Sequence, residues 1–323
     1  MDSVHAMRAI QVTSLDGPKA VQLVDLPAPA NPDQVVIEVH AVGVNFPDVL
    51  QTRGEYQIKM PLPFVPGSEV AGTVVSGPGF TPGQRVVGFC GWGGYAEQVG
   101  VDPTMVFPLP DALTFEQGAA LPMNYLTVEF ALQHRTQLRA GETILVQGAA
   151  GGIGVATTQF AKALGARVIA VVSTPDKEAT ARAAGADEVV VGLDFKGQVK
   201  ELTGGRGVDC VLDPVGGDRF TDSLRCLARE GRLLVVGFTA GIPEVKVNRL
   251  LLNNISIVGV AWGEYFMSNP GYLQEQWLRL LPHLESGALV PLVGNGYPLE
   301  AAAEALLELD ERRARAKVVI NVR

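Results

Sequence analysis

The chain has 323 residues, enough for two domains, and 47% of them are hydrophobic, which is sufficient for two cores. A formal net charge of −8 argues against nucleic acid or an anionic membrane surface as the main partner. No apolar run is long enough to span a bilayer, and the N-terminus carries no apolar signal core, so we expect a cytoplasmic protein. Three scattered cysteines without a Cys-x-x-Cys spacing indicate neither a disulfide framework nor a metal cluster.

The first hundred residues have the pattern of a β-rich domain. Short runs of alternating apolar and polar residues are separated by clusters of Gly, Pro and Asp. The predicted strands are Met7–Val12, Gln34–Val44, Val70–Val75, Arg85–Phe89 and Tyr95–Val101. Helical periodicity begins only after Thr114, a plausible N-cap, and a second helix is expected from about Leu126 to His134.

Strands and helices then alternate, which predicts a parallel sheet covered on both faces. The predicted strands are 143–147, 167–172, 188–191, 208–212, 231–236 and 255–260, and the helices between them are 152–164, 176–184, 195–202 and 218–228. Helices at 271–285 and 299–309 and a strand at 317–322 end the chain.

This order predicts an α/β protein with a discontinuous first domain. Residues 1–124 begin that domain, residues 125–262 form an inserted doubly wound domain, and residues 263–323 return to complete the first domain. The crevice between two such domains is the default ligand site.

Residues Thr143–Gly154, TILVQGAAGGIG, are the most informative stretch. A buried strand, a turn of small residues and an amphipathic helix follow one another, as in the first half of a dinucleotide-binding unit. A pyrophosphate must reach backbone amides at the helix N-terminus, so side chains have to be absent there. Ala149, Gly151 and Gly154 occupy the three fingerprint positions, with Gly152 and Ile153 between the last two. A plain strand-to-helix turn is the alternative, but the following strand favours a coenzyme site.

The end of the second strand of this unit indicates which coenzyme binds. Enzymes that use NAD place an acidic residue there for the ribose 2′-hydroxyl, whereas this chain has Ser173 followed by Thr174. Lys177 lies one turn into the next helix, where it could meet a 2′-phosphate. Asp176 is a contrary feature, but after Pro175 a carboxylate also suits a helix start. The sequence therefore predicts NADPH.

Five stretches together resemble one family over essentially the full length of the chain. They are GVNFPDVLQTRGEY from Gly43, PFVPGSEVAGTV from Pro63, VQGAAGGIG from Val146, VLDPVGG from Val211 and VVGFTAG from Val235. The chain resembles the zinc-independent quinone oxidoreductases, the zeta-crystallin group of the medium-chain dehydrogenase/reductase superfamily. The resemblance implies a GroES-like catalytic domain, a Rossmann domain, NADPH as hydride donor, and quinones or other activated alkenes as acceptors.

The chain departs from the zinc-dependent relatives at their metal ligands. Those enzymes place a cysteine where this chain has Asn45, and a histidine where it has Ser68, between Gly67 and Glu69. A catalytic zinc needs about three protein ligands, and two of them are replaced, so we predict no metal. Without a Lewis acid, quinones and enones are easier acceptors than simple ketones, because the charge left by hydride addition spreads onto a distant oxygen.

The resemblance also implies roles for individual residues. Asn45 and Tyr56 match the family's hydrogen-bond donors near the acceptor; a turn residue and a core aromatic are the respective alternatives. Leu50 stands where well-known quinone reductases have Tyr, which indicates a less polar pocket. The implied coenzyme contacts outside the Gly-rich turn and the Ser173 region are Phe46, Thr127, Val215, Phe238, Thr239 and Arg312. Core packing for Phe238 and a solvated basic run for Arg312 remain open.

Two other functions share these features. An NADPH-dependent 2-enal or 2-enoyl thioester reductase would need a proton donor, for which Tyr56 is a candidate, and a basic entrance for a CoA phosphate, of which the sequence gives no clear cluster. A non-catalytic NADPH-binding protein is the other alternative. The apolar run within Asn254–Val260 would be the last strand of the Rossmann sheet, and its open edge predicts a homodimer.

Overall fold

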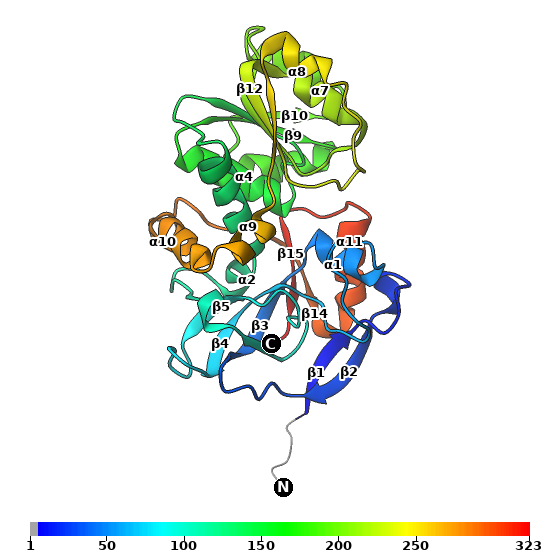
Figure 1. Cartoon of the computed structure of the whole chain (residues 1–323), viewed down its shortest axis with the longest axis vertical. Coiled ribbons are helices and arrows are strands. Elements are labelled where there is room, and N and C mark those ends of the chain that lie inside the picture. Colours follow the sequence, from blue (N-terminus) through cyan, green and yellow to red (C-terminus); the bar gives the residue numbers. More distant parts are fainter. Residues whose placement is uncertain (1–5) are drawn as a thin grey trace. The chain divides into compact units, whose positions relative to one another are not determined.

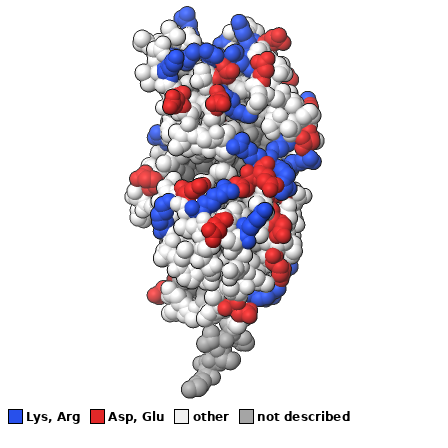
Figure 2. Space-filling model, turned by 90° about the vertical axis from the view of Figure 1, so that its right-hand side faces the viewer, with Lys and Arg blue, Asp and Glu red and all other residues white. Residues whose placement is uncertain are grey.

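The computed structural model describes residues 6–323, so the first five residues of the N-terminal stretch, on which the prediction of a cytoplasmic protein partly rests, lie outside the described residues. The chain divides into two compact units. Unit 1 comprises the chain up to Met123 together with Leu273–Leu278 and Val290–Arg323, and unit 2 comprises Asn124–Tyr272 and Arg279–Leu289. No helix of the described part is long and apolar enough to cross a membrane. In Figure 2, acidic and basic side chains are intermixed over the face that is shown.

Unit 1 is built on a seven-stranded sheet in the order β14-β15-β3-β4-β5-β7, with β6 paired to β3. All pairs are antiparallel except β14 and β15. Its strands are β3 (Val35–Gly43), β4 (Glu69–Ser76), β5 (Arg85–Phe89), β6 (Gln98–Val101), β7 (Val106–Pro108), β14 (Val293–Pro298) and β15 (Lys317–Asn321). A separate hairpin pairs β1 (Ala6–Gln11) with β2 (Gln22–Pro27). The core contains the inward residues of β3, β4 and β15, Val39, Val70 and Ile320 among them.

Three helices of unit 1 pack against its sheet or against one another, and they carry or support its candidate site. They are α1 (Phe46–Thr52), α2 (Phe115–Gly118) and α11 (Ala302–Asp310). Thr114 is the N-cap of α2, as the sequence predicts: its hydroxyl accepts from the N–H of Gln117 at 3.2 Å, and the Gln117 side chain accepts from the N–H of Thr114 at 2.9 Å. The sequence did not predict α1.

Unit 2 contains a six-stranded parallel sheet in the order β10-β9-β8-β11-β12-β13. In chain order this is 3-2-1-4-5-6, the doubly wound Rossmann arrangement. Its strands are β8 (Thr143–Val146), β9 (Arg167–Val172), β10 (Glu188–Val191), β11 (Val208–Asp213), β12 (Leu227–Val235) and β13 (Ser256–Gly259). Strands β9, β10 and β12 of this sheet are labelled in Figure 1. The predicted parallel sheet and α/β class are confirmed.

The helices of unit 2 lie before, between or after these strands. They are α3 (Thr127–Glu129), α4 (Gly152–Ala163), α5 (Glu178–Ala183), α6 (Phe195–Leu202), α7 (Phe220–Arg225), α8 (Asn248–Asn253) and α9 (Trp262–Ser268); α10 (Tyr272–Glu285) has residues in both units. The predicted helix 126–134 is α3 flanked by π-helical turns at Pro122–Leu126 and Phe130–Arg135.

The predicted helix 218–228 is too long, because α7 ends at Arg225 and β12 already begins at Leu227. Leu227 pairs with Val208, and the pairing with β11 then resumes only at Arg232. Glu230 in the interruption has a left-handed φ of 61°. The apolar spacing of Leu224, Leu227 and Ala228 also fits a helical face, so periodicity alone did not separate the two structures.

Candidate functional site

Three loops of unit 2 follow the carboxyl ends of neighbouring strands and form its candidate coenzyme edge. They are residues 147–151 after β8, 214–217 after β11 and 236–241 after β12. Strands β8 and β11 lie side by side, although two strands and three α-helices separate them in sequence, because the strand order reverses between them. Such a reversal leaves an opening at the carboxyl edge of the sheet, where doubly wound proteins bind dinucleotides.

The small residues of the Gly-rich turn at this edge have different structural roles. Gly148 takes the left-handed conformation that turns the chain, with φ 60°, while Ala149 is fully buried. A Cβ on Gly154 would lie 2.3 Å from the Gly148 carbonyl oxygen, so the helix–turn packing requires glycine there. A Cβ on Gly151 would meet nothing closer than 3.5 Å. Gly151 is therefore the position where a ligand can approach the backbone.

Helix α4 starts directly at this open position. Gly152 and Ile153 begin its first turn, whose N–H groups have no acceptor within the helix. These donors and the helix dipole favour a bound anion. A Cβ on Gly152 would lie 2.5 Å from the amide nitrogen of Asn124, so the helix start is also closely packed on one side. The turn thus fits the pyrophosphate of a dinucleotide.

Backbone hydrogen bonds join the second and third loops of the coenzyme edge. The N–H of Thr239 donates to the Pro214 carbonyl at 3.3 Å, and that of Ala240 donates to the Val215 carbonyl at 2.8 Å. The buried Asp213 carboxylate accepts from the N–H groups of Val215 and Gly216 at 2.7 and 3.0 Å, and burial raises its pKa. In the third loop, residues 236–241, the side chain of Phe238 is 42% exposed. The structure therefore brings the predicted contacts Val215, Phe238 and Thr239 together.

The other predicted coenzyme contacts are distributed over both units. Ser173 and Thr174 are exposed directly after β9, and Lys177 ends the 3₁₀ turn that follows. Thr127 is buried in α3. Phe46 begins α1 and exposed Arg312 follows α11, so both belong to unit 1. Their roles toward the coenzyme stay predictions.

Unit 1 contains a buried polar cluster formed by Asn45, Glu69 and Lys317. Asn45 precedes α1, Glu69 begins β4 and Lys317 begins β15. The Lys317 ammonium donates to Asn45 Oδ1 at 2.7 Å and to Glu69 Oε1 at 2.5 Å. The Asn45 amide nitrogen donates to Glu69 Oε1 at 2.8 Å and to the Gly43 carbonyl at 3.3 Å. Glu69 is fully buried and Lys317 is 3% exposed, so solvent hardly screens this ion pair.

Asp48 extends the cluster into the first turn of α1. Its Oδ2 accepts from the Asn45 N–H at 2.8 Å and from the Tyr95 hydroxyl at 3.1 Å, whereas its fully buried Oδ1 has no partner in the described structure. Burial raises the pKa of Asp48 to about 7, although the Asn45 hydrogen bond and the charge of Lys317 act in the opposite direction. A group with this pKa changes charge near neutral pH.

Tyr56 lies in the irregular segment just beyond α1 and is half-buried. Among the described residues, no hydrogen-bond partner is found for its hydroxyl. Burial and the charge of Asp48 raise its pKa, so the hydroxyl keeps its proton at neutral pH. A free, protonated phenol can donate a hydrogen bond to an oxyanion. Asn45 differs, because both hydrogens of its amide already point to acceptors in the protein.

The residues at the metal positions of zinc-dependent relatives are poor metal ligands here. Asn45 and Ser68 are neutral, and the amide nitrogen of Asn45 lies 3.5 Å from the Ser68 hydroxyl. Over residues 6–323, no three His, Cys, Asp or Glu side chains are grouped so that they could hold a metal ion. The donor set does not fit the zinc site of those relatives.

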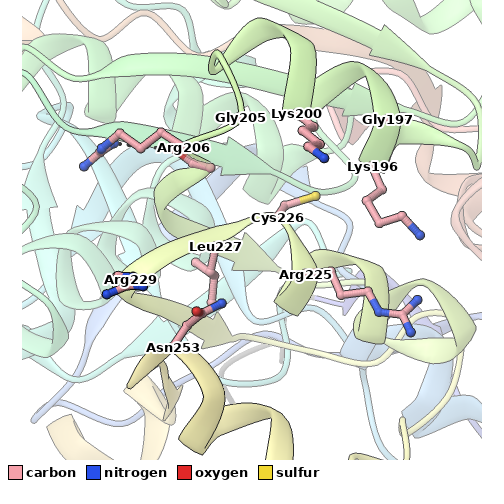
Figure 3. Close-up of a pocket in the computed structure, with 11 residues that line it drawn as sticks. Lys196, Gly197, Lys200, Gly205, Arg206, Arg225, Cys226, Leu227, Arg229 and Asn253 are labelled. Atoms are coloured by element: carbon pink, nitrogen blue, oxygen red, sulfur yellow. Dashed lines mark hydrogen bonds between the residues drawn. The ribbon is translucent and has the colours of Figure 1, made fainter.

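Unit 2 also has a basic pocket of about 480 Å³, shown in Figure 3, which the sequence did not predict. The basic side chains that line it are Lys196, Lys200, Arg206, Arg225 and Arg229. Lys196 and Arg225 share the carboxylate of Asp222, and Arg206 pairs with Asp209. In Figure 3 the side chain of Arg206 points away from those of Lys196 and Arg225.

This pocket lies at the amino ends of the strands, opposite the coenzyme edge. Gly207 precedes β11 and Leu227 opens β12. A six-residue strand separates the two edges by roughly 20 Å. The pocket therefore offers no basic group to a substrate at the coenzyme edge.

The sequence pointed to Asn45 but not to its charged partners. Lys317 and Asn45 are 272 positions apart, and Glu69 was noted only as part of a motif. Gly148, which turns the chain, lies outside the three fingerprint positions. The dipeptide Ala316-Lys317, a lysine at the start of an apolar strand, was the available signal for an inward-facing charge.

Two family models match the chain, and each match falls largely within one unit. The model described as alcohol dehydrogenase GroES-like domain matches residues 31–111. The model described as zinc-binding dehydrogenase matches residues 152–285. The fold class predicted from sequence, a GroES-like domain plus a Rossmann domain, is confirmed by these matches and by the two sheets.

Relatives and solved structures match over nearly the whole chain. Quinone oxidoreductase-like protein 2 of Bos taurus is 37% identical over 326 residues, covering 98% of this chain and 93% of that protein. A structure described as a probable oxidoreductase from Mycobacterium abscessus is 46% identical, covers 99% of this chain and 100% of its own, and superposes with a TM-score of 0.91. The quinone oxidoreductase of Thermus thermophilus, solved also with NADPH, is 37% identical with a TM-score of 0.85, covering 98% and 100%.

Proposed function

Because the chain belongs to the zinc-independent quinone oxidoreductases of the medium-chain dehydrogenase/reductase superfamily, we propose that it transfers hydride from NADPH to a quinone or a similar conjugated carbonyl. One observation carries this choice of acceptor: the positions of the zinc ligands are occupied by the neutral side chains of Asn45 and Ser68. The Asn45 amide is also hydrogen-bonded to Lys317 and Glu69. An acceptor that disperses its own developing charge suits a site without a Lewis acid.

The coenzyme edge provides what NADPH requires. Gly151 leaves room for the pyrophosphate, and the first turn of α4 supplies N–H donors and a favourable dipole. Exposed Ser173 and Thr174, with Lys177 beyond them, leave the ribose end without an acidic side chain at the strand terminus. When bound, NADPH supplies the hydride. The protein holds and orients it.

Tyr56 is the proposed donor to the reduced acceptor. Hydride addition to a conjugated carbon places negative charge on the acceptor oxygen, which then needs a hydrogen bond and finally a proton. The Tyr56 hydroxyl is unengaged within the described residues, and its raised pKa keeps it protonated. Loss of one such donor lowers kcat about 100-fold. The loss of kcat should be smaller for readily reduced quinones than for enals, because the oxyanion formed from a quinone needs less stabilisation.

A panel of acceptors tests the proposal. Quinones, 2-enals and 2-enoyl thioesters are each offered with NADPH to the wild type and to Tyr56→Phe, and kcat/KM is measured. Highest kcat/KM for a quinone, with a larger Tyr56→Phe loss for the enal, supports the proposed function. Preference for an enoyl thioester would make the protein a reductase of that class. Tight NADPH binding without turnover of any acceptor would indicate a non-catalytic NADPH-binding protein.

Coenzyme preference is tested at Lys177. A charge-assisted contact to a 2′-phosphate contributes about 1.5–3 kcal/mol, which corresponds to roughly ten- to a hundredfold discrimination. Lys177→Ala should lower the ratio of kcat/KM for NADPH to kcat/KM for NADH by roughly ten- to a hundredfold. Arg206→Ala, at the opposite edge of the same sheet, should leave the ratio unchanged. Equal kcat/KM for the two coenzymes in the wild type would refute the preference.

We also propose that the protein is a homodimer joined through the β13 edge of the unit 2 sheet. Strand β13 ends the sheet, so one side of its backbone has no neighbouring strand within the described residues. Helix α8, which precedes it, exposes Leu251 and Leu252 at 79% and 73%. An open edge beside exposed apolar residues is prone to pairing with another chain.

A further inference from the structure

Lys317 places a buried positive charge in the polar cluster of unit 1. Its ammonium is buried at the start of β15 and contacts Asn45 Oδ1 and Glu69 Oε1. A lysine is seldom buried unless its charge is paired, because leaving water is costly. Here the pairing is made with one carboxylate and one amide oxygen.

The ammonium fixes which way the Asn45 amide faces. With its oxygen on Lys317, the amide nitrogen must point to Glu69 Oε1 and the Gly43 carbonyl, at 2.8 and 3.3 Å. The flipped amide would set its NH₂ group against the ammonium and its oxygen against the Glu69 carboxylate, and both contacts would be repulsive. Asn45 therefore has one favourable orientation in this cluster.

Asn45 in turn holds the start of α1. Its backbone N–H donates to Asp48 Oδ2 at 2.8 Å, and its backbone carbonyl accepts from the Asp48 N–H at 3.0 Å. The other end of α1 is held separately, by the ion pair of Arg53 with Asp310. Tyr56 follows α1 after only a short segment, and the charge of Asp48 in the first turn contributes to its raised pKa, so its hydroxyl lies within electrostatic reach of the helix start that Asn45 holds.

Glu69 keeps the ammonium in place from the opposite side. Its second oxygen, Oε2, accepts from the Met123 N–H at 2.6 Å, so the carboxylate cannot turn away without losing that bond. Gly43 lines the same space: a Cβ there would lie 2.5 Å from Glu69 Oε1 and 2.8 Å from Lys317 Cε. The cluster is closely packed as well as paired.

We propose that Lys317 is a positioning residue of the acceptor site, which acts through the Asn45 amide on the start of α1 and thereby on the Tyr56 hydroxyl. This inference rests on the proposed function, because the consequence it names is the rate of acceptor reduction. Lys317 does not itself touch the acceptor in this scheme, and of the predicted coenzyme contacts only Phe46 adjoins the cluster, so the Kd for NADPH should change little.

The test uses Lys317→Met, which keeps the length of the side chain and removes its charge. We expect kcat for the best quinone to fall at least tenfold, with the Kd for NADPH changed less than twofold. Lys317→Arg, which keeps a cation, should recover part of the rate. Lys19→Met, an exposed lysine of the same unit, is the matched control and should behave as the wild type.

Two double variants separate positioning from stability. Lys317→Met with Glu69→Gln removes both charges of the buried ion pair, so the thermal midpoint should rise toward that of the wild type while kcat stays low. In an Asn45→Ala background, Lys317→Met should cost less than twofold in kcat, because the group through which it acts is gone. Recovery of kcat together with stability, or full additivity of the two losses, would overturn the proposal.

A spectroscopic readout keeps this test independent of the substrate. The side-chain ¹⁵N resonance of Asn45, assigned by its absence in Asn45→Ala, should shift in Lys317→Met and not in Lys19→Met. An unshifted resonance would refute the proposal even in an active enzyme. If the wild type reduces no quinone but the resonance shifts, the proposed function fails while the orienting contact stands.

Discussion

The coenzyme edge of unit 2 and the polar cluster of unit 1 are built in opposite ways. The edge is a backbone site: small residues within one twelve-residue stretch leave space, and a helix N-terminus supplies the donors. The cluster is a side-chain site, assembled from Asn45, Glu69 and Lys317 on three separate segments. A backbone site can be recognised from a short local pattern, whereas a side-chain site becomes visible only once the sheet has formed.

The largest effect expected is at Gly154 on the coenzyme edge. A methyl group there would meet the Gly148 oxygen at 2.3 Å and the Ala149 Cα at 2.5 Å, and both are backbone atoms that cannot move aside. Gly154→Ala should abolish measurable NADPH binding in a fluorescence titration and destabilise unit 2. Gly151→Ala should fold normally and weaken NADPH binding only, because its methyl occupies ligand space. Gly197→Ala, with open space around it, is the control. Equal behaviour of all three would contradict a backbone site.

Gly43 offers the matching test of the polar cluster. A Cβ there would lie 2.2 Å from the Ala119 carbonyl oxygen and 2.5 Å from Glu69 Oε1. We expect Gly43→Ala to lower the free energy of unfolding by about 3 kcal/mol and to reduce kcat, with the Kd for NADPH unchanged. At Gly88 the nearest atom is Ile37 Cδ1 at 3.0 Å, a side-chain end that can shift, so Gly88→Ala should be milder. A change in NADPH affinity with Gly43→Ala would show that the two regions are not independent.

The proposed dimer concerns only the edge of unit 2. Leu251→Asp with Leu252→Asp places charges on the exposed apolar face of α8. We expect light scattering at micromolar concentration to give twice the 34.2 kDa chain mass for the wild type and the chain mass for the double variant. A wild type that is monomeric at that concentration would refute the pairing of β13.

A pH dependence of the stability is expected from Asp48. Its pKa in the folded protein is about 7, raised by burial from the ordinary value of 3.8. Between these values the folded state binds more protons than the unfolded state, so the free energy of unfolding falls as pH rises, by at most about 1.4 kcal/mol per unit. Asp48→Asn, which keeps an oxygen acceptor, should flatten this slope in denaturant unfolding between pH 4 and 7. An unchanged slope would mean that Asp48 does not titrate in that range.

The sequence predicted the elements of unit 2 better than those of unit 1. Strands β9 and β10 lie where the sequence predicted them, because short apolar runs bounded by turn residues are typical of buried parallel strands. Strands β2 and β14 were missed, since their exposed faces are polar or rich in glycine. Helix α1 was missed because its seven residues are too few to show a helical apolar period, although Pro47 in its first turn is typical of a helix start.

The same contrast holds for the candidate sites. The small residues of the Gly-rich turn and the loops at Val215 and Thr239 were predictable, because each follows a recognisable strand. The partners of Asn45 were not, since only the antiparallel pairing of β15 with β3, and of β3 with β4, brings Lys317 and Glu69 to it. A charge that is buried by distant pairing leaves little trace in local sequence.

Hydride transfer without a metal is tested most directly with NADPH deuterated at the transferred C4 position. Reduction of a quinone by the wild type and by Tyr56→Phe is followed in single turnover, with and without a chelator. We expect a primary deuterium isotope effect on the reductive step in both proteins, no change with chelator, and a rate about 100-fold lower in Tyr56→Phe for a demanding acceptor. Activity that disappears with chelator and returns with zinc would contradict metal-free transfer, and with it the proposed roles of Asn45 and Lys317.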